Sequence, residues 1–479
     1  MSTSRATSDP RPPWAALPVV LAGIVMVVLD FFIVNVTMPA LQTDLGAGPA
    51  ALEWIVAGYS LTAGVWLVSS GRLGDRYGRR RMYLLGMALF TVASALCGLA
   101  PDAGTLVAAR LAQGAAAALL TPQVLAIIGV AFTGAARGTA IAAYGLAMGV
   151  AAVSGQLVGG VLVEWDVAGL GWRSCFLINV PVGLAALAAG RLIPESRAPG
   201  RAGLDLTGAV LLTAGLAAVL VPLIEGRAQG WPAWTWVAMT GAAGLLAAFG
   251  VRQRRLAARG GDPLLHPALL RSRAFGAAVA TQSVFWCSAA SFFLVLALYL
   301  QDGRGLDPIA AGLVFTILAA AYMATSLVAP ALAERNPRRV VLTGAASLAA
   351  GNAVLLVVVA RDGGDAAIAA LAPGLAAVGA GMGLLITPLV ALALADVGPR
   401  WAGAASGALS TVQNVGNAIG VAVVGAVYFG RLDQGPAQAF EASLVVLTAI
   451  AAAVLLPAVL LPRPRRAEAG GTSAVAEAR

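Results

Sequence analysis

The sequence predicts an all-α integral membrane protein with fourteen transmembrane helices, arranged as two six-helix bundles with two extra helices between them. Hydrophobic residues make up 59% of the 479 residues and charged residues only 11%, and the mean hydropathy is +0.85. Soluble chains of this length are less apolar. A short charged segment also occurs twice, once in each half of the chain, which indicates an internal repeat.

Apolar runs of about 20 residues are long enough to cross a hydrocarbon core of about 30 Å. Six such runs are expected in an N-terminal bundle over residues 15–200, two in a linker with a cytoplasmic loop over 201–272, and six in a C-terminal bundle over 273–462. Cytoplasmic tails, 1–14 and a disordered 463–479, complete the chain. The expected spans are residues 15–38, 53–71, 82–100, 104–131, 138–163, 172–193, 205–224, 234–251, 274–300, 308–333, 339–360, 366–395, 402–430 and 440–462.

The arginines predict the orientation in the membrane. The net charge is +9, and all 31 basic residues are arginine. With the N-terminus in the cytoplasm, the inner loops and tails hold 25 of the 31 arginines and the outer loops hold five, while Arg110 lies inside a span. This bias predicts that both termini are cytoplasmic, in a cell (inner or plasma) membrane, and it explains the positive charge without a nucleic-acid partner.

A charged turn over residues 71–81 separates the second and third expected spans. Because little more than ten residues join them, these two spans must be antiparallel neighbours. Gly71 and Gly74 remove side chains where helix ends are expected to approach closely, and Gly78 permits the positive φ that reverses the chain.

Asp75 is the only acid among the five arginines of this turn. Its carboxylate can pair with Arg76 or Arg79, or face a helix N-terminus, in one conformation and lose that partner in another. Alternatively, the arginines only mark the cytoplasmic side. The expected conformational-switch motif comprises Gly71, Gly74, Asp75, Arg76, Gly78, Arg79 and Arg80.

The second half repeats the first. Residues 330–339 align with the charged turn, with Glu334 in place of Asp75, and Leu-Thr-Pro at 120–122 matches Ile-Thr-Pro at 386–388. Two half-bundles related in this way predict a central site that opens to each side of the membrane in turn, by alternating access.

Asp30 is the only carboxylate well inside an expected span. A charge at such a position costs about 2.5–3.5 kcal/mol on insertion scales, so it is expected to face the bundle interior. Burial favours the neutral acid, which makes Asp30 a candidate proton carrier. The alternative is a structural, hydrogen-bonded aspartate.

Arg110 is expected at a depth similar to that of Asp30. Counting from the outer helix ends at about 1.5 Å per residue places both residues roughly 10–14 Å deep. They can then pair directly or through water, and the pair is the candidate for proton coupling. A purely structural role for Arg110 stays open.

The charged turn, G-x-L-x-D-R-x-G-R-R-R in this sequence, resembles the signature loop between helices 2 and 3 of the major facilitator superfamily. Arg110-Leu-Ala-Gln113-Gly114 resembles the family's R-x-x-Q-G motif, whose arginine is tied to proton transfer in antiporters. The run Gly155-Gln156-x-x-Gly159-Gly160 resembles the antiporter motif G-P-x-x-G-G, with Gln156 in place of proline. The glycine face alone is also explained by close helix packing.

Two further segments, together with fourteen spans, resemble the drug:proton antiporter branch of that family: Leu29-Asp30-x-x-Ile33-Val34-Asn35-Val36-x-x-Pro39, with Phe32 where threonine is common, and Trp172-Arg173-x-x-Phe176-Leu177-Ile178-Asn179-Val180-Pro181. The resemblance implies a major-facilitator-type fold and export of small amphipathic drug-like molecules in exchange for protons.

A polar stripe follows one face of the span 402–430, where it either joins helices or lines the substrate cavity. The members of the stripe are Ser406, Ser410, Gln413, Asn414 and Asn417. Weaker candidates for the cavity are Gln282, Trp286, Tyr59, Tyr144 and Tyr322. Asn35 and Gln113 are further cavity candidates.

The leading hypothesis is a proton-coupled multidrug or antibiotic exporter that works as a monomer. Alternatives are a dedicated exporter of one endogenous metabolite, an importer, and a receptor or scaffold that does not transport. No motif for ATP binding, metal ligation or nucleophilic catalysis stands out, so neither a cofactor nor an enzymatic activity is expected.

Overall fold

The computed structural model describes residues 13–197, 205–362, 367–394, 397 and 402–461. These residues form helices and no strand. Thirteen helices are long and apolar enough to cross a membrane, and α6, which is bent by 41°, makes a fourteenth. The predicted fold class with fourteen spans is therefore confirmed. Most of the two predicted tails lies outside the described residues.

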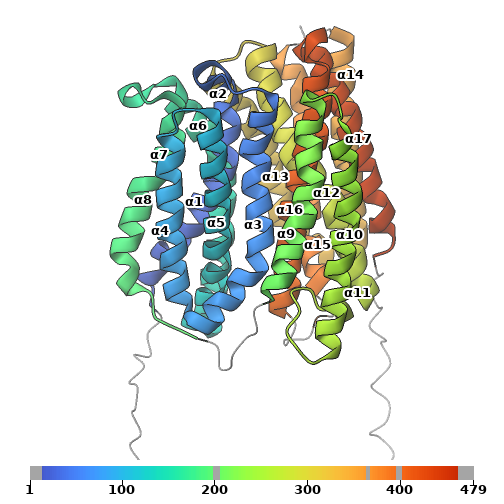
Figure 1. The fold of residues 1–479 in the computed structure, drawn as a ribbon. Helices are drawn as coiled ribbons and strands as arrows, with labels where there is room; N and C mark the ends of the chain where they lie inside the picture. Colours follow the sequence, from blue (N-terminus) through green and yellow to red (C-terminus); the bar gives the residue numbers. More distant parts are fainter. Residues whose placement is uncertain (1–12, 198–204, 363–366, 395–396, 398–401, 462–479) are drawn as a thin grey trace, which may run out of the picture.

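The N-terminal half holds the first six spans, which Figure 1 draws in blue and teal. We call the end of the molecule at which α1 begins the lower end, as drawn in Figure 1. The last helix of the chain, α17, also ends toward this side. The helices are α1 (Ala16–Ile33), α2 (Met38–Leu45), α3 (Pro49–Tyr77), α4 (Arg79–Gly98), α5 (Ala103–Ala131), α6 (Gly134–Glu164), α7 (Ser174–Leu177) and α8 (Asn179–Ala188), with 3-10 segments over Val34–Thr37, Val167–Gly169, Gly171–Arg173 and Ala189–Leu192.

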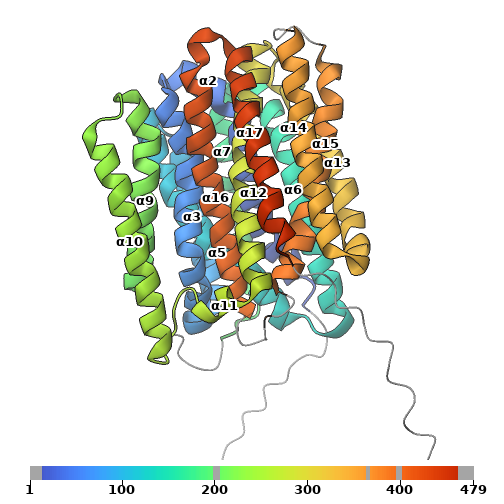
Figure 2. The ribbon, with the colours of Figure 1, turned by 90° about the vertical axis from the view of Figure 1, so that its right-hand side faces the viewer.

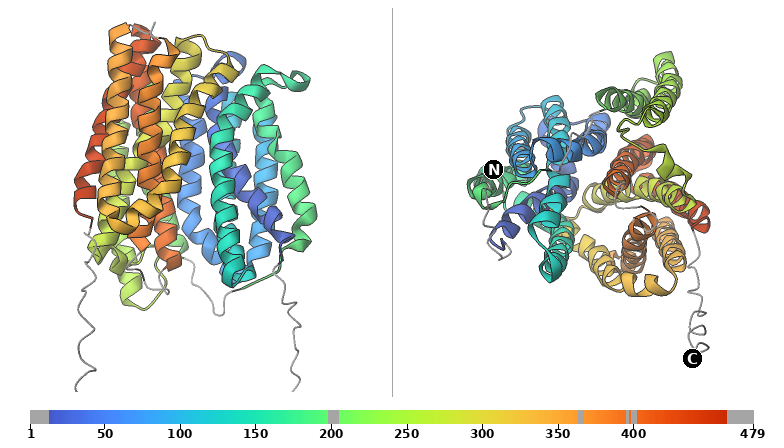
Figure 3. Two further views of the ribbon diagram at one scale, coloured as in Figure 1. Left: turned by 180° about the vertical axis from the view of Figure 1, so that it is seen from behind. Right: turned by 90° about the horizontal axis from the view of Figure 1, so that it is seen from below.

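The C-terminal half follows a hairpin of two extra spans, α9 and α10. Seen from below, the two halves form separate groups of helices and the hairpin lies at their periphery (Figure 3). The helices are α9 (Leu206–Ala228), α10 (Ala233–Ala258), α11 (Pro267–Arg271), α12 (Arg273–Leu298), η5 (Tyr299–Gly303), α13 (Pro308–Arg335), α14 (Pro337–Asp362), α15 (Ile368–Leu394), α16 (Ala402–Gly430), η7 (Leu432–Gln434) and α17 (Pro436–Val459).

Local chemistry sets several helix ends. Pro308 stands in the first turn of α13, where its missing N–H removes no intrahelical hydrogen bond. Asp102 caps α5, because its side chain accepts a hydrogen bond from the backbone N–H of Thr105 at 2.8 Å. That bond holds the pKa of Asp102 below its usual value.

The turn between α3 and α4 is shorter than predicted. Residues 71–77 continue α3, and Gly78 alone separates the two helices, with φ at 111°. The prediction of a longer turn is wrong because its glycines and arginines are compatible with helix. The positive φ expected for Gly78 is confirmed.

The two halves contact each other most closely near the upper end. A Cβ placed on Gly160 of α6 would lie 3.0 Å from Cα of Ile309 on α13, and one placed on Gly312 would lie 2.9 Å from the carbonyl oxygen of Gln156. At Gly149, nearer the lower end, only the Met323 side chain is within reach, at 3.7 Å. Gly145 meets nothing within 4 Å. Helices α6 and α13 thus converge at the upper end and separate toward the lower end, as Figure 3 also shows.

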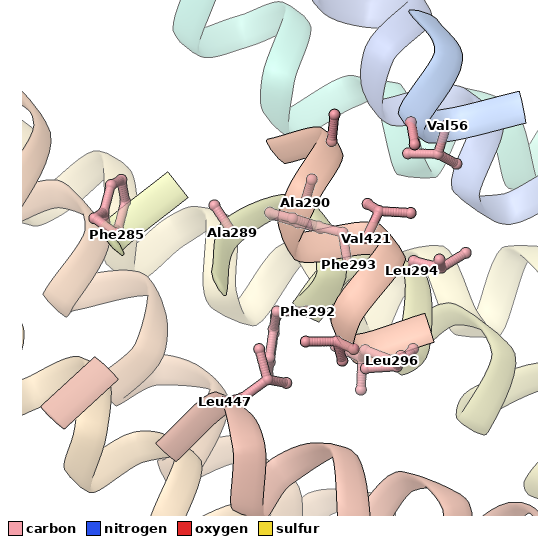
Figure 4. Close-up of a cluster of buried hydrophobic side chains, with 14 of the residues drawn as sticks. Val56, Phe285, Ala289, Ala290, Phe292, Phe293, Leu294, Leu296, Val421 and Leu447 are labelled. Carbon is pink, nitrogen blue, oxygen red and sulfur yellow. The ribbon is translucent and has the colours of Figure 1, made fainter. Parts of the chain in front are cut away.

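Helices α3 and α16 form the second seam between the halves. Thr411 Oγ1 donates a hydrogen bond to the carbonyl oxygen of Gly64 at 2.9 Å. A Cβ on Gly64 would lie 2.9 Å from Cβ of Asn414. Nearer the upper end, Val56 of α3 and Val421 of α16 belong to one buried apolar cluster with the α12 side chains (Figure 4). The apolar core therefore continues from one half into the other.

The hairpin α9–α10 packs on the outside of α3 (Figure 2). Near the upper end, Trp54 Nε1 donates a hydrogen bond to Glu225 of α9 at 2.9 Å. Near the lower end, Arg72 donates to the backbone carbonyl of Asp262, just after α10, at 2.7 Å. Polar contacts at both ends thus hold the two extra spans against the N-terminal half.

Candidate functional site

Asp30 and Arg110 form a buried ion pair inside the N-terminal half. Asp30 lies on α1 and Arg110 on α5, and both residues are 0% exposed. Arg110 Nη1 lies 2.5 Å from Asp30 Oδ2. The prediction that the two residues lie at similar depth is confirmed, and they pair directly. Removing one partner of such a buried ion pair strongly destabilises the folded protein.

Two amide side chains besides Arg110 contact the Asp30 carboxylate. Gln113 Nε2 and Asn179 Nδ2 donate hydrogen bonds to Asp30 Oδ1 at 2.8 and 3.1 Å. The same two amides donate to Ser94 Oγ at 3.1 and 2.9 Å. Gln113 was expected at the substrate cavity, and the structure places it in this network. Every one of these partners belongs to the N-terminal half.

Arg110 has partners besides Asp30. Its Nε donates to the carbonyl oxygen of Ile55 at 3.0 Å, and its Nη1 donates to Gln113 Oε1 at 2.7 Å. The guanidinium carbon lies 4.3 Å from the centre of the Tyr59 ring, which is a favourable cation–π distance. The cation therefore keeps three partners when the Asp30 carboxyl is neutral. This arrangement can bind a proton at Asp30 without leaving Arg110 unpaired.

A chain of aromatic rings leads from this pair to the other half. The rings of Tyr59 and Phe31 lie 6.4 Å apart, and those of Phe31 and Phe32 lie 5.2 Å apart. Phe32 contacts Phe293 of α12 edge to face at 5.0 Å, and Phe293 stacks on Phe315 of α13 at 5.7 Å. Contact with the C-terminal half thus begins within two residues of Asp30.

The first span is interrupted just above Asp30. Helix α1 ends at Ile33 and continues as a 3-10 turn over Val34–Thr37. Asn35, an expected cavity residue, donates to the carbonyl oxygen of Phe32 at 3.1 Å. Its Oδ1 is buried and accepts no hydrogen bond from the described residues. An acceptor left in this state is available to a ligand or a water molecule.

The glycine face of α6 packs against α1 and α13. A Cβ on Gly155 would lie 2.9 Å from Cβ of Phe32, and one on Gly159 would lie 2.8 Å from Cγ1 of Ile33. Gly160 faces α13, as described above. Gln156 is 2% exposed, and its amide finds no hydrogen-bond partner among the described residues. The bend of α6 lies between residues 152 and 154 although no proline is present.

Asp75 of the charged turn pairs with Arg79 at 2.9 Å, across the junction of α3 and α4. A Cβ on Gly74 would lie 2.7 Å from Cδ of Gln123, so the close approach expected there is confirmed. The expectation for Gly71 is wrong, because the nearest atom, on Pro122, would lie 3.9 Å away.

The remaining basic residues of the turn have separate contacts. Arg76 lies over the Tyr77 ring at 5.2 Å. The backbone N–H of Arg80 donates to Glu195 Oε1 at 3.2 Å. Glu195 follows the sixth span and was not predicted. Because Glu195 lies in a predicted loop, its position in the sequence did not indicate a contact with the charged turn.

We expect Asp75→Asn to impair transport by shifting the balance between conformations. A partly exposed ion pair contributes about 0.2–1 kcal/mol, so the shift should be about 1.4- to fivefold. Substrate affinity in a fixed conformation should change little, because Asp75 lies at the lower helix ends. A cysteine introduced at Val56, buried in the α3–α16 seam, reports upper-end opening by its labelling rate.

Arg81→Gln is the matched control, because it removes a charge from the same turn and keeps the Asp75–Arg79 pair. If the labelling rate and transport of Asp75→Asn both equal those of the control, Asp75 has no role as a switch.

The polar stripe of α16 packs partly against α3. Asn414 donates to the carbonyl oxygen of Ser410 at 2.9 Å and lies beside Gly64. Asn417 is buried, whereas Ser406 is exposed. The half-buried Gln413 completes the stripe. Asn414 thus packs on α3, but its hydrogen bond stays within α16, and the bond that joins the two helices is donated by Thr411.

The last expected cavity residues lie in three places. Gln282 donates to the carbonyl oxygen of Leu409 at 3.5 Å, and Trp286 packs edge to face on Phe285 at 5.0 Å. Tyr322 and Tyr144 lie half-buried on α13 and α6. None of these residues takes part in the Asp30 network.

Glu53 is a buried carboxylate that the sequence did not indicate. Glu53 is 0% exposed, one turn inside α3, and it packs against Gly425 of α16. It was the first residue of a predicted span, 53–71, and therefore looked like a helix end. The structure begins α3 at Pro49, which places Glu53 inside the seam between the halves.

Comparisons with known proteins identify the family of this chain. The profile described as Major Facilitator Superfamily matches residues 20–421, with a second match over 278–477. The chain is 40% identical to the probable actinorhodin transporter of Streptomyces coelicolor, over 92% of this chain and 77% of that protein. It is 35% identical to the puromycin resistance protein pur8 of Streptomyces alboniger, over 98% of this chain and 96% of that protein. It is 34% identical to the cephamycin export protein CmcT of Amycolatopsis lactamdurans, over 96% of this chain and 94% of that protein.

Solved structures show the same fold at low identity. A POT family peptide transporter in an auto-inhibited form superposes with a TM-score of 0.67 at 18% identity, over 93% of this chain and 95% of that chain. The xylose transporter XylE from E. coli superposes with a TM-score of 0.61 at 15% identity, over 93% and 96%.

The fold and the buried pair define a multi-pass membrane protein built from two helical halves that meet at a central seam. The chain belongs to the Major Facilitator Superfamily, a family of membrane transporters.

Proposed function

We propose that this chain is a secondary active exporter that moves amphipathic drug-like molecules out of the cell in exchange for protons, by alternating access. The observation that carries the proposal is the fully buried Asp30–Arg110 pair, whose aromatic neighbours reach the other half. Relatives named for actinorhodin transport, puromycin resistance and cephamycin export support the substrate class.

Asp30 is the proposed proton carrier. In the structure it is paired with Arg110, and a proton on the carboxyl removes that attraction. Arg110 then keeps the carbonyl of Ile55, the amide of Gln113 and the ring of Tyr59. Because Tyr59 and Phe31 begin the aromatic chain to α12, a change in the pair alters the packing between the halves. This coupling needs no other titratable group.

The lower end is the proposed cytoplasmic side. The arginines of the charged turn lie there, and an excess of arginine marks the cytoplasmic face. The halves separate toward this end and pack together at the upper end. In this conformation substrate enters from the cytoplasm. The protein is proposed to work as a monomer, since each chain contains both halves of the pathway.

A second candidate is export of one compound. The relatives named for actinorhodin, puromycin and cephamycin each carry the name of a single antibiotic. Such specificity requires convergent polar groups, and the buried, unpartnered Oδ1 atoms of Asn35 and Asn417 in the described residues can supply acceptors.

Expression in an efflux-deficient bacterial host tests both candidates. A panel of antibiotics and dyes is scored for resistance and for efflux, with and without a protonophore. The proposed function requires resistance to several amphipathic compounds that the protonophore removes. Resistance to one compound alone favours the dedicated exporter. Resistance that survives the protonophore contradicts proton coupling.

We also expect the cavity to favour neutral or monocationic substrates. The buried carboxylates of the described spans are Asp30 and Glu53, and Glu53 lies in the upper seam rather than in the Asp30 network. A second substrate charge without a partner costs about 2.5–3.5 kcal/mol, so export of a dication should be slower by about a hundredfold. Two dyes that differ only in having one or two fixed positive charges provide the measurement, and equal export rates contradict the argument.

A further inference from the structure

A groove opens between α16 and α17 near the upper end of the molecule. The two helices contact each other and lie side by side on the surface that Figure 2 turns toward the viewer. The groove has a volume of about 680 Å³, and its polar lining comes from Arg431, Gln434, Gln438 and Glu441. These four side chains are not part of the Asp30 network. The groove is therefore a feature separate from the buried ion pair.

The groove runs from the loop between the two helices down to the depth of the hydrocarbon layer. Arg431 directly follows α16, and α17 begins at Pro436. Val446, which also lines the groove, lies ten residues after Pro436, or about 15 Å along the helix at about 1.5 Å per residue. That depth is about half of a hydrocarbon core of about 30 Å. The groove thus spans one leaflet of the bilayer.

The upper part of the groove carries one charge of each sign. Arg431 is exposed and Glu441 is half-buried. Arg431 Nη1 donates to Gln434 Oε1 at 3.3 Å, whereas Glu441 has no hydrogen bond or ion pair among the described residues. Side chains lean toward the N-terminal end of their helix. Because α17 begins at the upper end, Glu441 is directed toward the level of Arg431.

A phospholipid whose headgroup ends in a primary ammonium fits these two charges. Its phosphate can accept hydrogen bonds from the guanidinium of Arg431, and its ammonium can donate hydrogen bonds to the carboxylate of Glu441. Its acyl chain can follow the apolar lower part of the groove, along Val427, Val445 and Val446. An anionic headgroup brings no cation to Glu441, and a quaternary ammonium has no N–H to donate. The groove therefore distinguishes headgroups by charge and by hydrogen-bond donors.

We propose that the groove between α16 and α17 binds a zwitterionic phospholipid with a primary-amine headgroup, with Arg431 on the phosphate and Glu441 on the ammonium. Arg431 contributes to the binding of any phospholipid, whereas Glu441 sets the choice of headgroup. The proposal does not depend on the direction of transport, because the upper end meets a lipid leaflet in either orientation of the chain.

Photo-crosslinking of the full chain in lipid nanodiscs tests the proposal. The nanodiscs consist of phosphatidylcholine with a small fraction of a phospholipid that has a photoreactive acyl chain. The headgroup of this probe is either phosphatidylethanolamine or phosphatidylcholine. Mass spectrometry of peptides measures the crosslinked fraction over residues 426–446. The upper part of α10, where Val237 is 69% exposed, is the reference surface.

In the unaltered protein the ethanolamine probe should label the groove at least about threefold more than the choline probe, as a charge-assisted hydrogen bond in a partly exposed site predicts. Both probes should label α10 equally. Glu441→Gln should make the two probes equal in the groove, and Arg431→Gln should reduce labelling by both. The matched control is Asp433→Asn, which removes an exposed acid from the same loop outside the groove and should behave like the unaltered protein.

Equal labelling of the groove by the two probes in the unaltered protein overturns the proposal, and this comparison requires no variant to fold. A preference for the ethanolamine probe that persists in Glu441→Gln overturns it as well. If an exported dye reduces labelling by both probes alike and the probes do not differ, the groove holds substrate rather than lipid, and the proposal is wrong. The outcome is separate from the proposed function, because crosslinking does not require transport.

Discussion

Asp30→Asn is expected to abolish uphill efflux driven by a proton gradient, with transport falling to the level of membranes that lack the protein. The amide keeps the size of the carboxyl group and loses its titratable proton. Arg110 keeps the carbonyl of Ile55 and the amide of Gln113, which limits the loss of stability to less than the about 3–5 kcal/mol of a fully broken buried pair. Efflux of a fluorescent substrate under an imposed pH gradient provides the measurement.

The matched control for this variant is Ser94→Ala. Ser94 is a buried member of the same network, and it contacts Gln113 and Asn179 rather than the Asp30 carboxylate. Its variant should retain coupled efflux. Membrane content and thermal stability of both variants are measured in parallel. Wild-type uphill efflux by Asp30→Asn at equal membrane content would remove Asp30 from the proton pathway.

Gly160→Val is expected to have the second largest effect, because it prevents closure of the upper end. A Cβ at this position would already lie 3.0 Å from Cα of Ile309 and 2.8 Å from the carbonyl carbon of Pro308. These are backbone atoms of another helix, so they cannot move aside as a flexible side chain can. Without closure the cycle stops, and transport should fall by about five- to 150-fold, as overpacking of about 1–3 kcal/mol predicts.

Gly145→Val makes the same chemical change on the same helix. Gly145 meets nothing within 4 Å in this conformation, so this variant should leave the closed upper end intact. The labelling rate of a cysteine at Val56 should rise in Gly160→Val and stay unchanged in Gly145→Val. If the labelling rates of the two variants are equal, the α6–α13 contact at Gly160 does not hold the upper end closed.

The spans and the ion pair could be predicted because each depends on position along a single helix. Membrane thickness sets the length of a span, and counting residues from the span ends placed Asp30 and Arg110 at similar depth. A pairing of Asp75 with Arg76 or Arg79 was among the alternatives predicted, because both are local in sequence, and the structure shows Arg79. The length of the turn and the close approach at Gly71 were predicted wrongly, since residues 71–77 also suit a helix.

Contacts that join distant helices could not be predicted. Asn179 of the sixth span donates to the Asp30 carboxylate, and Ser94 of the third span contacts Asn179 and Gln113. Whether these side chains meet depends on helix rotation, which the sequence does not give. Gln113 was assigned to the cavity because side-chain direction within a span depends on helix rotation. Glu53 was missed because a shift of four residues in a helix boundary moves it from a loop into a seam.

Purified protein in liposomes tests the central claim, proton-coupled exchange, most directly. A pH indicator inside the liposomes follows proton movement while a substrate gradient is imposed and no pH gradient is present. The account predicts substrate-dependent proton movement opposite to the substrate, lost in Asp30→Asn and kept in Ser94→Ala. Substrate movement without any proton flux, or with protons moving in the same direction, would contradict it.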